Sequence, residues 1–195
     1  MTCNFYDENA DSFFNDTVKA DMSYIYQKFL PLLKNGEHIL DAGCGSGRDT
    51  YFFLKHGFQV TAFDASEALV SKAREYTGID VTVDTFETFK NEQSHFLFDA
   101  IWACASLLHV PSSEIKKSFV NLSAQLKKEG VFYCSFKLGS NDTSRNGRNF
   151  TNADEARLKV FIANTGLVID CTWITDDVRP ERQDEQWFNA ILRKL

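Results

Sequence analysis

The chain has 195 residues, of which 44% are hydrophobic and 25% charged, the composition of a globular protein with a core of its own. Its 21 basic and 27 acidic residues leave a net charge of -6, which argues against nucleic acid or an anionic membrane as a partner. The five cysteines are widely spaced and form no C-x-x-C pair, so we predict neither a disulfide framework nor a metal site.

The N-terminal segment predicts a helix. Apolar residues between Ala10 and Leu33 recur at spacings of three and four, and Pro31 should end or kink the helix. The first residues carry no signal-peptide pattern, and no apolar run approaches the roughly 18 residues of a membrane span. We therefore expect a cytoplasmic protein without membrane contact. It should form a single domain, 1–195, in which residues 1–35 are a helical cap on a core of residues 36–195.

After residue 36, strand and helix patterns alternate. Helices are expected up to His56, from Ser66 to about Tyr76, from Ser112 or Ser113 to Gly130, and from Asp154 to Thr165. Short apolar runs predict strands at residues 38–43, 58–64, 78–84, 97–105, 131–138, 167–175 and 185–193. This alternation, with a late pair of strands, predicts a three-layer α/β domain.

Residues 139–149, GSNDTSRNGRN, contain no hydrophobic side chain. The tract follows the fifth predicted strand, at the edge of the sheet where ligands bind. We predict a loop that could act as a lid.

The most informative stretch is HILDAGCGSGRDT, which starts at His38. A strand ends there in three alternate glycines, the arrangement that lets backbone approach a nucleotide-type ligand closely. A dinucleotide site would want another glycine where Arg48 stands. Asp41, two residues before the loop, would repel a diphosphate but suits an ammonium group.

This loop resembles motif I of the class I S-adenosylmethionine-dependent methyltransferases. Asp64 stands at the end of the second strand, where a carboxylate can accept hydrogen bonds from ribose hydroxyls, and Asp84-Thr85-Phe86 follows the third. AIWACASLLHV resembles motif IV of the family. The resemblance implies a Rossmann-like methyltransferase fold, with a mostly parallel seven-stranded sheet and an antiparallel C-terminal strand. It implies S-adenosylmethionine as cofactor, bound by Asp41, Gly43, Cys44, Gly45, Gly47, Asp64, Ala65, Thr85, Phe86, Ala103 and Cys104.

Within that superfamily, GCGSGRDT and the terminal ILRK resemble the small bacterial tellurite-resistance-type methyltransferases. The chain departs from them by its additional N-terminal helix. It also has Val178-Arg179 where that family carries a His-Arg pair. The resemblance implies a small-molecule substrate without naming it.

Three residues are candidates for catalysis: His109, Arg48 and Arg179. His109 follows motif IV and could be a general base or a residue flanking a helix. Arg48 sits in the first turn of a helix, where a cation opposes the dipole, so it should bind an acidic substrate group or a carboxylate such as Asp41. Cys44 and Cys104 are expected as wall residues, because methyl transfer needs no enzyme nucleophile.

Four residues are candidates for substrate contact. Tyr6 and Phe14 could close the pocket or pack in the core, and Lys137 and Arg148 make the late loops locally positive. We therefore expect a small, anionic or heteroatom acceptor. Open alternatives are a metalloid acceptor, RNA methylation, a nicotinamide-dependent oxidoreductase and a non-catalytic cofactor-binding protein.

Overall fold

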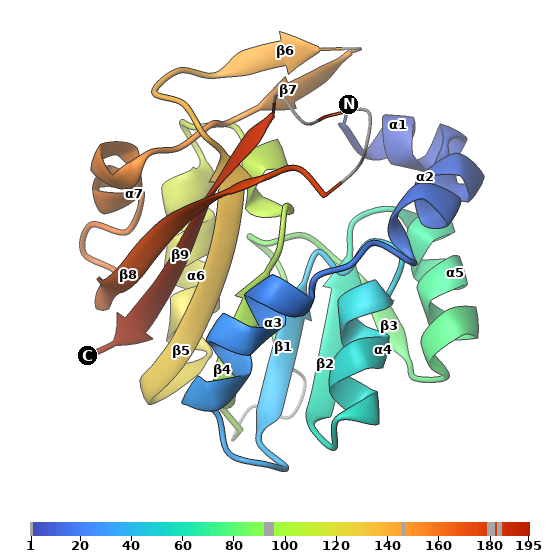
Figure 1. Cartoon of the computed structure of the whole chain (residues 1–195), viewed down its shortest axis with the longest axis horizontal. Helices are drawn as coiled ribbons and strands as arrows, with labels where there is room; N and C mark the ends of the chain where they lie inside the picture. The colour runs from blue at the N-terminus through green and yellow to red at the C-terminus, as the bar shows by residue number, and fades with distance from the viewer. Residues whose placement is uncertain (1, 92–95, 146, 179–181, 183–184) are drawn as a thin grey trace.

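The computed structural model describes residues 2–91, 96–145, 147–178, 182 and 185–195. Within them, seven strands form one sheet in the order β3-β2-β1-β4-β5-β9-β8 (Figure 1). The first five strands of this sheet are parallel, and β9 runs antiparallel to both β5 and β8. The strands are β1 (His38–Ala42), β2 (Gln59–Asp64), β3 (Val81–Val83), β4 (Phe98–Ala103), β5 (Leu126–Lys137), β8 (Leu167–Asp176) and β9 (Gln186–Lys194). The predicted α/β class and mostly parallel seven-stranded sheet are confirmed.

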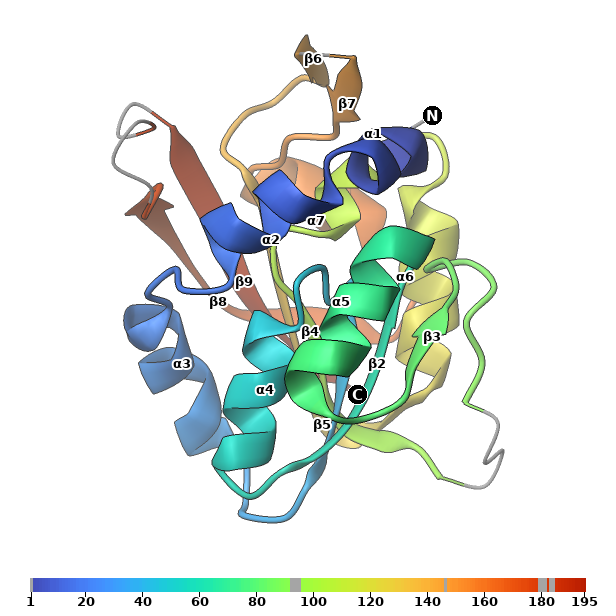
Figure 2. The same cartoon turned by 90° about the vertical axis from the view of Figure 1, so that its right-hand side faces the viewer.

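Helices cover both faces of the sheet (Figure 2). One face carries α3 (Ser23–Phe29), α4 (Arg48–Lys55) and α5 (Glu67–Thr77), and the other carries α6 (Ile115–Ala124) and α7 (Glu155–Phe161). Two short helices, α1 (Thr2–Glu8) and α2 (Ala10–Thr17), lie over the carboxyl ends of the parallel strands. Two 3-10 turns are η1 (Leu30–Leu32) and η2 (Leu107–His109).

Alternation along the central strands divides the core between the two faces. In β4, Trp102 packs with Phe29 and Phe53 from the helices of the first face. Its neighbour Ile101 belongs to the cluster on the second face, with Phe119 from α6. Because β4 is buried on both sides, it reads in sequence as a continuous apolar run, as a central parallel strand should.

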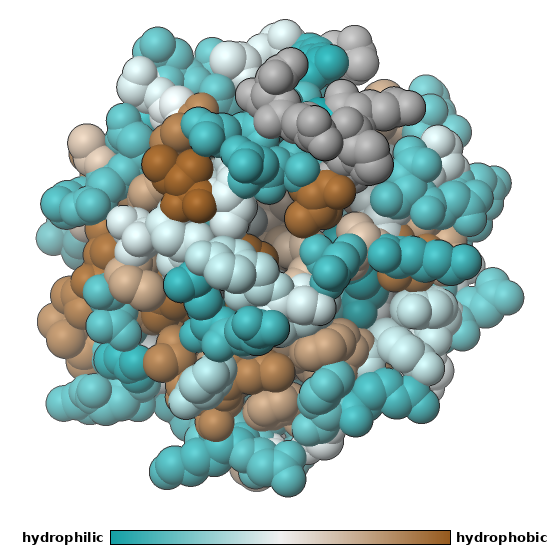
Figure 3. Space-filling model, in the orientation of Figure 1, coloured by the Kyte–Doolittle hydropathy of each residue, from teal (hydrophilic) through white to brown (hydrophobic). Residues whose placement is uncertain are grey.

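Hydrophilic residues predominate on the surface seen in Figure 3, with hydrophobic residues in small groups between them. No helix among the described residues is long and apolar enough to cross a membrane. A mostly hydrophilic surface is expected of a globular protein that buries its large apolar residues in a core.

The N-terminal segment differs from the single helix predicted over Ala10 to Leu33. The helical stripe breaks after α2, and α3 begins at Ser23, whose N–H donates to the carboxylate of Asp21 at 2.9 Å. The break moves α2 over the sheet edge while α3 packs on the sheet face (Figure 1). Spacing alone missed it, because both helices bury residues of the same apolar pattern.

Two further predictions were wrong in detail. Gly130 does not end α6, since β5 already begins at Leu126, and the pairing of β4 with β5 shifts register between Phe98 and Ala100. The tract 139–149 is not all loop: β6 (Thr143–Arg145) and β7 (Arg148–Phe150) form a two-stranded hairpin. The strands are mostly polar and show no hydrophobic alternation, so the sequence signal for the hairpin is the Asn146-Gly147 pair between them.

Gly47 allows α4 and α5 to approach each other. It has a left-handed φ of 77°, and a Cβ there would lie 2.8 Å from Thr77 Cγ2 and 3.2 Å from Ala73 Cα. Gly78 also has a left-handed φ, 75°, but its Cβ would meet nothing within 4 Å. The two glycines share the same backbone requirement and differ in their surroundings.

Gly47→Ala should therefore destabilise the fold more than Gly78→Ala. The backbone penalty of alanine is about 1 to 2 kcal/mol at each position, and the clash at position 47 should add about 1 to 3 kcal/mol. Urea denaturation of both variants measures the difference. Equal losses in free energy of unfolding would show that the helices do not need this close approach.

Candidate active site

A cavity of about 630 Å³ opens where the parallel strands end. It lies where the strand order reverses, between β1 and β4, which is the ligand site of open parallel sheets. The predicted residues that line it are Tyr6, Gly43, Cys44, Gly45, Arg48, Asp64, Ala65, Thr85, Phe86, Cys104, His109, Lys137 and Arg148.

The remaining predicted residues of the described chain do not line the cavity. Phe14, expected at the cavity, packs on Tyr76, because adjacent positions of α2 face different ways, and Phe13 lines the wall instead. Ala103 is fully buried in the core beneath the sheet, and Gly47 packs on α5. Arg179 lies outside the described residues.

The glycine loop is fixed by its neighbours on both sides. A Cβ on Gly43 would lie 2.7 Å from Ser106 Cβ, so this glycine makes room for the segment after β4. Asp64 accepts hydrogen bonds from the N–H groups of Gly45 and Ser66, each at 2.9 Å. Burial raises the pKa of Asp64 against the lowering effect of these bonds. The two hydrogen bonds therefore fix the orientation of the Asp64 carboxylate at the cavity wall.

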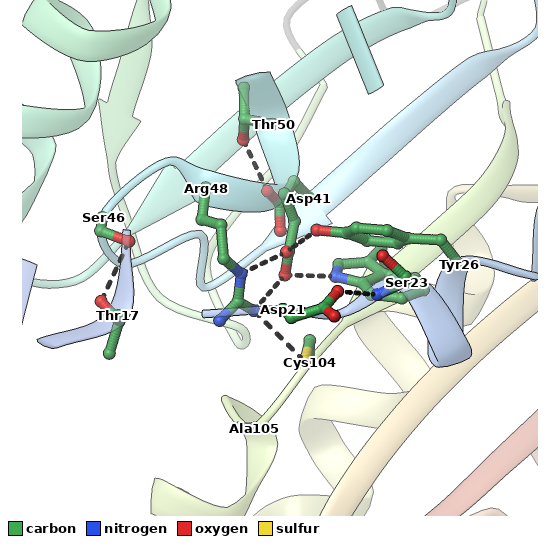
Figure 4. A network of polar contacts seen from close by, with 12 residues as sticks. Thr17, Asp21, Ser23, Tyr26, Asp41, Ser46, Arg48, Thr50, Cys104 and Ala105 are labelled. Carbon is green, nitrogen blue, oxygen red and sulfur yellow. Dashed lines mark hydrogen bonds and ion pairs between the residues drawn. The ribbon is translucent and has the colours of Figure 1, made fainter. Parts of the chain in front are cut away.

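Asp41 is buried behind the loop, and the structure does not place it among the lining residues. Its carboxylate accepts a hydrogen bond from the Thr50 hydroxyl at 2.5 Å (Figure 4). Burial, followed by the charge of Asp49, raises the pKa of Asp41 well above its ordinary value. Direct contact with a ligand ammonium stays a prediction.

Arg48 binds a carboxylate, as one of the two alternatives expected, but the carboxylate is that of Asp49. Its Nε and Nη2 atoms lie 2.7 and 2.8 Å from the two Asp49 oxygens, and Nη2 lies 3.8 Å from Cys104 Sγ (Figure 4). Tyr26 Oη and Trp102 Nε1 also donate to Asp49, at 2.5 and 2.8 Å. Burial alone would raise the pKa of Asp49, yet Arg48 and these donors together hold it below its ordinary value.

The N-terminal helices form the roof of the cavity. The hydroxyl of Thr17 donates to Ser46 of the glycine loop at 3.1 Å (Figure 4), and Ser66 donates to Asp7 at 2.6 Å. Lys72 of α5 forms an ion pair with Asp11. Contacts therefore run from α1 and α2 to both the loop and α5.

His109 contacts the N-terminal helices through Tyr6. Its Nε2 atom and the Tyr6 hydroxyl are hydrogen-bonded at 2.7 Å. Burial, and after it the charge of Arg148, lowers the pKa of His109 to about 4. The imidazole is therefore neutral at neutral pH, the form that a general base requires.

The two predicted cations of the late loops differ in their partners. Lys137 lines the cavity and forms an ion pair with Glu185, which also binds Arg145 at 2.7 Å. Arg148 lies over the rings of Phe5 and Phe150, at 4.3 and 5.3 Å from their centroids.

The two cavity cysteines stay protonated. Burial raises the pKa of Cys104 to about 12 and that of Cys44 well above its ordinary value. Both are free thiols. These properties fit the expected wall residues better than nucleophiles. The described residues hold no cluster of three or more His, Cys, Asp or Glu that could bind a metal.

Sequence reasoning missed part of the cavity wall. Asp49 and Ser106 lie within the quoted stretches GCGSGRDT and AIWACASLLHV, so attention to every polar residue of these motifs could have found them. Tyr133, Trp187 and Asn189 come from β5 and β9 and extend the cavity beyond the parallel strands. Only the antiparallel pairing of β9 beside β5 brings the last two there.

The strand order and the cavity at its switch point define a Rossmann-like protein with a nucleotide-type site. A sequence model for a family described as a methyltransferase domain matches residues 39–130. This match and the strand order together support the class I S-adenosylmethionine-dependent methyltransferase superfamily, as the sequence resemblance indicated. The finer likeness to tellurite-resistance-type proteins stays a prediction.

Curated relatives carry methyltransferase names. The chain is 29% identical over 119 residues to the ubiquinone biosynthesis O-methyltransferase of Coxiella burnetii (strain RSA 493 / Nine Mile phase I), covering 58% of this chain and 48% of that protein. It is 33% identical over 100 residues to the protein of the same name from Xanthomonas oryzae pv. oryzae (strain PXO99A), covering 49% and 40%. The match thus spans about half the length of these relatives or less.

Solved structures share the fold. The 1,6-didemethyltoxoflavin-N1-methyltransferase of Burkholderia thailandensis, with bound 1,6-didemethyltoxoflavin and S-adenosylhomocysteine, superposes with a TM-score of 0.77 at 20% identity, covering 99% of this chain and 85% of that chain. The magnesium protoporphyrin IX methyltransferase of Synechocystis PCC 6803, with bound SAM, gives a TM-score of 0.66 at 16% identity, covering 97% and 80%.

Asp49→Asn should destabilise the fold by about 3 to 5 kcal/mol, the cost of breaking a buried ion pair and leaving its cation uncompensated. Asp80→Asn is the matched control, because the Asp80 side chain is 83% exposed. Chemical denaturation measures both variants. A loss below about 1 kcal/mol for Asp49→Asn would contradict the role of this carboxylate.

His109 should make the free energy of unfolding depend on pH. Its folded pKa of about 4 lies below the ordinary 6.5, so the unfolded chain takes up the proton first as pH falls. Stability is then fully present above about pH 6.5 and is lost toward pH 4, by about 3 kcal/mol from this group. His109→Gln should remove that part of the acid loss, whereas His56→Gln, at an exposed position, should not. Denaturation at pH 7 and pH 4.5 compares them, and identical acid losses in wild type and His109→Gln would refute the assignment.

Proposed function

We propose that this protein transfers a methyl group from S-adenosylmethionine to a small-molecule acceptor. The observation that carries the proposal is the Asp64 carboxylate, held by the Gly45 and Ser66 N–H groups at the wall of the cavity. A carboxylate fixed in this way at the end of a second strand can accept hydrogen bonds from two ribose hydroxyls. The family membership of residues 39–130 supports the same cofactor.

The lining residues fit this cofactor. Space along the glycine loop depends on the absence of side chains, since a Cβ on Gly45 would lie 3.2 Å from the Phe13 ring. Thr85 and Phe86 would hold the adenine, and Cys44 and Ala65 complete the predicted wall. When bound, the cofactor supplies an activated methyl group, so the protein's task is alignment and exclusion of water. Alignment alone can contribute about 7 to 11 kcal/mol to lowering the barrier.

His109 is the candidate general base for an acceptor that must lose a proton. It lines the cavity, is neutral, and already forms a hydrogen bond to a hydroxyl, that of Tyr6. A neutral hydroxyl acceptor could be bound in a similar manner. An anionic or soft acceptor, such as a metalloid oxyanion, would need no base.

A small-molecule acceptor is supported by the relatives. The two curated relatives described above are named for ubiquinone biosynthesis, and one solved structure holds 1,6-didemethyltoxoflavin. Methylation at oxygen or nitrogen would suit these names. RNA methylation is less well supported, because the chain carries a net charge of -6.

Calorimetric titration with S-adenosylhomocysteine and with NAD separates the main alternatives. Binding of the first without the second supports the proposal, and the reverse would indicate an oxidoreductase. Incubation with labelled S-adenosylmethionine and a metabolite extract then distinguishes an enzyme from a non-catalytic binding protein, which would yield no methylated product.

Asp64→Ala should weaken S-adenosylhomocysteine binding by about 1 to 3 kcal/mol, the scale of lost hydrogen bonds to a charged group. The loss should be smaller for the analogue that lacks the ribose 2′-hydroxyl, which separates ribose contacts from changes in the loop. Asp80→Ala is the control, since Asp80 is exposed and does not line the cavity. Unchanged affinity in Asp64→Ala would refute the ribose assignment.

A further inference from the structure

Arg148 differs in its partners from two other cations that line the cavity, Arg48 and Lys137. Arg48 and Lys137 are each bound to a carboxylate, Asp49 and Glu185 respectively. Arg148 forms no ion pair with any described carboxylate. Its Nη1 atom donates only a long hydrogen bond, 3.4 Å, to the Tyr6 hydroxyl. The Nε atom of Arg148 is buried from solvent without a hydrogen-bond partner.

Aromatic rings surround this guanidinium instead. Its Cζ atom lies 4.3 Å from the ring centroid of Phe5, 5.3 Å from that of Phe150 and 5.9 Å from that of Tyr6. Ring faces attract a cation, but they leave the N–H donors along the guanidinium edge unused. A cation held in this manner is prepared for a planar oxyanion that accepts two parallel hydrogen bonds.

The surroundings of Arg148 select for a flat molecule. Tyr6, Phe13, Tyr133, Phe150 and Trp187 all line the same cavity. His109 lies beside them, with its ring 5.3 Å from that of Phe150. The cavity therefore combines an uncompensated cation, a group able to take a proton, and aromatic walls.

From this combination we propose that the methyl acceptor is a planar aromatic carboxylate whose carboxyl group binds Arg148. The inference rests on the proposed methyltransferase function and names its substrate class. The carboxylate occupies the N–H edge of Arg148, and the ring lies between the aromatic walls. Arg148 in this assignment fixes the acceptor and takes no part in proton transfer.

Matched pairs of acids and amides test the proposal. The protein is first saturated with S-adenosylhomocysteine and then titrated with 4-hydroxybenzoate, indole-3-carboxylate and quinoline-2-carboxylate, each beside its neutral carboxamide. At least one acid should bind about tenfold or more tightly than its amide, which is the scale of hydrogen bonds to a charged group. If no acid in the panel binds better than its amide, the proposal is overturned.

Variants of the hairpin locate the effect. Arg148→Gln should abolish the preference for the acid, and Arg148→Lys, which keeps the charge but not the fork, should retain part of it. Arg145→Gln is the matched control: Arg145 is the register partner of Arg148, is exposed, and binds Glu185 outside the cavity wall. A preference that survives in Arg148→Gln would overturn the assignment of Arg148.

The titration also distinguishes failure of the proposed methyltransferase function from failure of the proposed substrate class. Failure of wild-type protein to bind S-adenosylhomocysteine contradicts the methyltransferase proposal itself. Cofactor binding without any preference for acids contradicts only the substrate class. Because the acid and amide comparison uses wild-type protein, it stands even if the Arg148 variants fold poorly.

Discussion

The buried carboxylate of Asp49 is the interaction on which the floor of the cavity depends. It joins α4 to α3 through Tyr26 and to the central strand β4 through Trp102. A charge placed there without compensation would cost several kcal/mol, so Arg48 and the neutral donors are required together. The arginine opposes the dipole of α4, and its bidentate bond to Asp49 explains why it is nevertheless placed in the first turn.

The same cluster sets the electrostatics of the neighbouring loop. Asp41 lies close enough to Asp49 for that charge to raise its pKa, and the Thr50 hydroxyl donates a hydrogen bond to Asp41. The raised pKa favours the protonated form of the Asp41 carboxyl. A positive ligand group near the glycine loop would favour its ionised form, so Asp41 favours an ammonium or sulfonium centre over a diphosphate even from behind the loop.

How far the sequence predicts this molecule depends on whether the determining interaction is local. The strands, the Ser66 cap and the glycine loop follow from patterns within a few residues, and Ser66 indeed accepts a hydrogen bond from the Leu69 N–H. The turn between α2 and α3 and the hairpin of β6 and β7 have only short local signals, the Asp21–Ser23 hydrogen bond and the Asn146-Gly147 pair, which the spacing of apolar residues does not show. Phe13 was missed in favour of Phe14 for the same reason: a two-sided helix shows which residues are apolar but not which side meets the cavity.

The proposed acceptor site is formed by segments that are far apart in the sequence: α1, the segment after β4, and β7 of the hairpin. Tyr6 from α1 contacts both His109 after β4 and Arg148 in β7, so three parts of the chain meet at one hydroxyl. Burial and then the charge of Arg148 lower the pKa of His109, and the charge of Lys137 adds a smaller lowering. An anion bound to Arg148 would cancel that second effect and return basicity to the imidazole. The carboxylate of an acidic acceptor would thereby strengthen the base beside it, and only when the acceptor is in place.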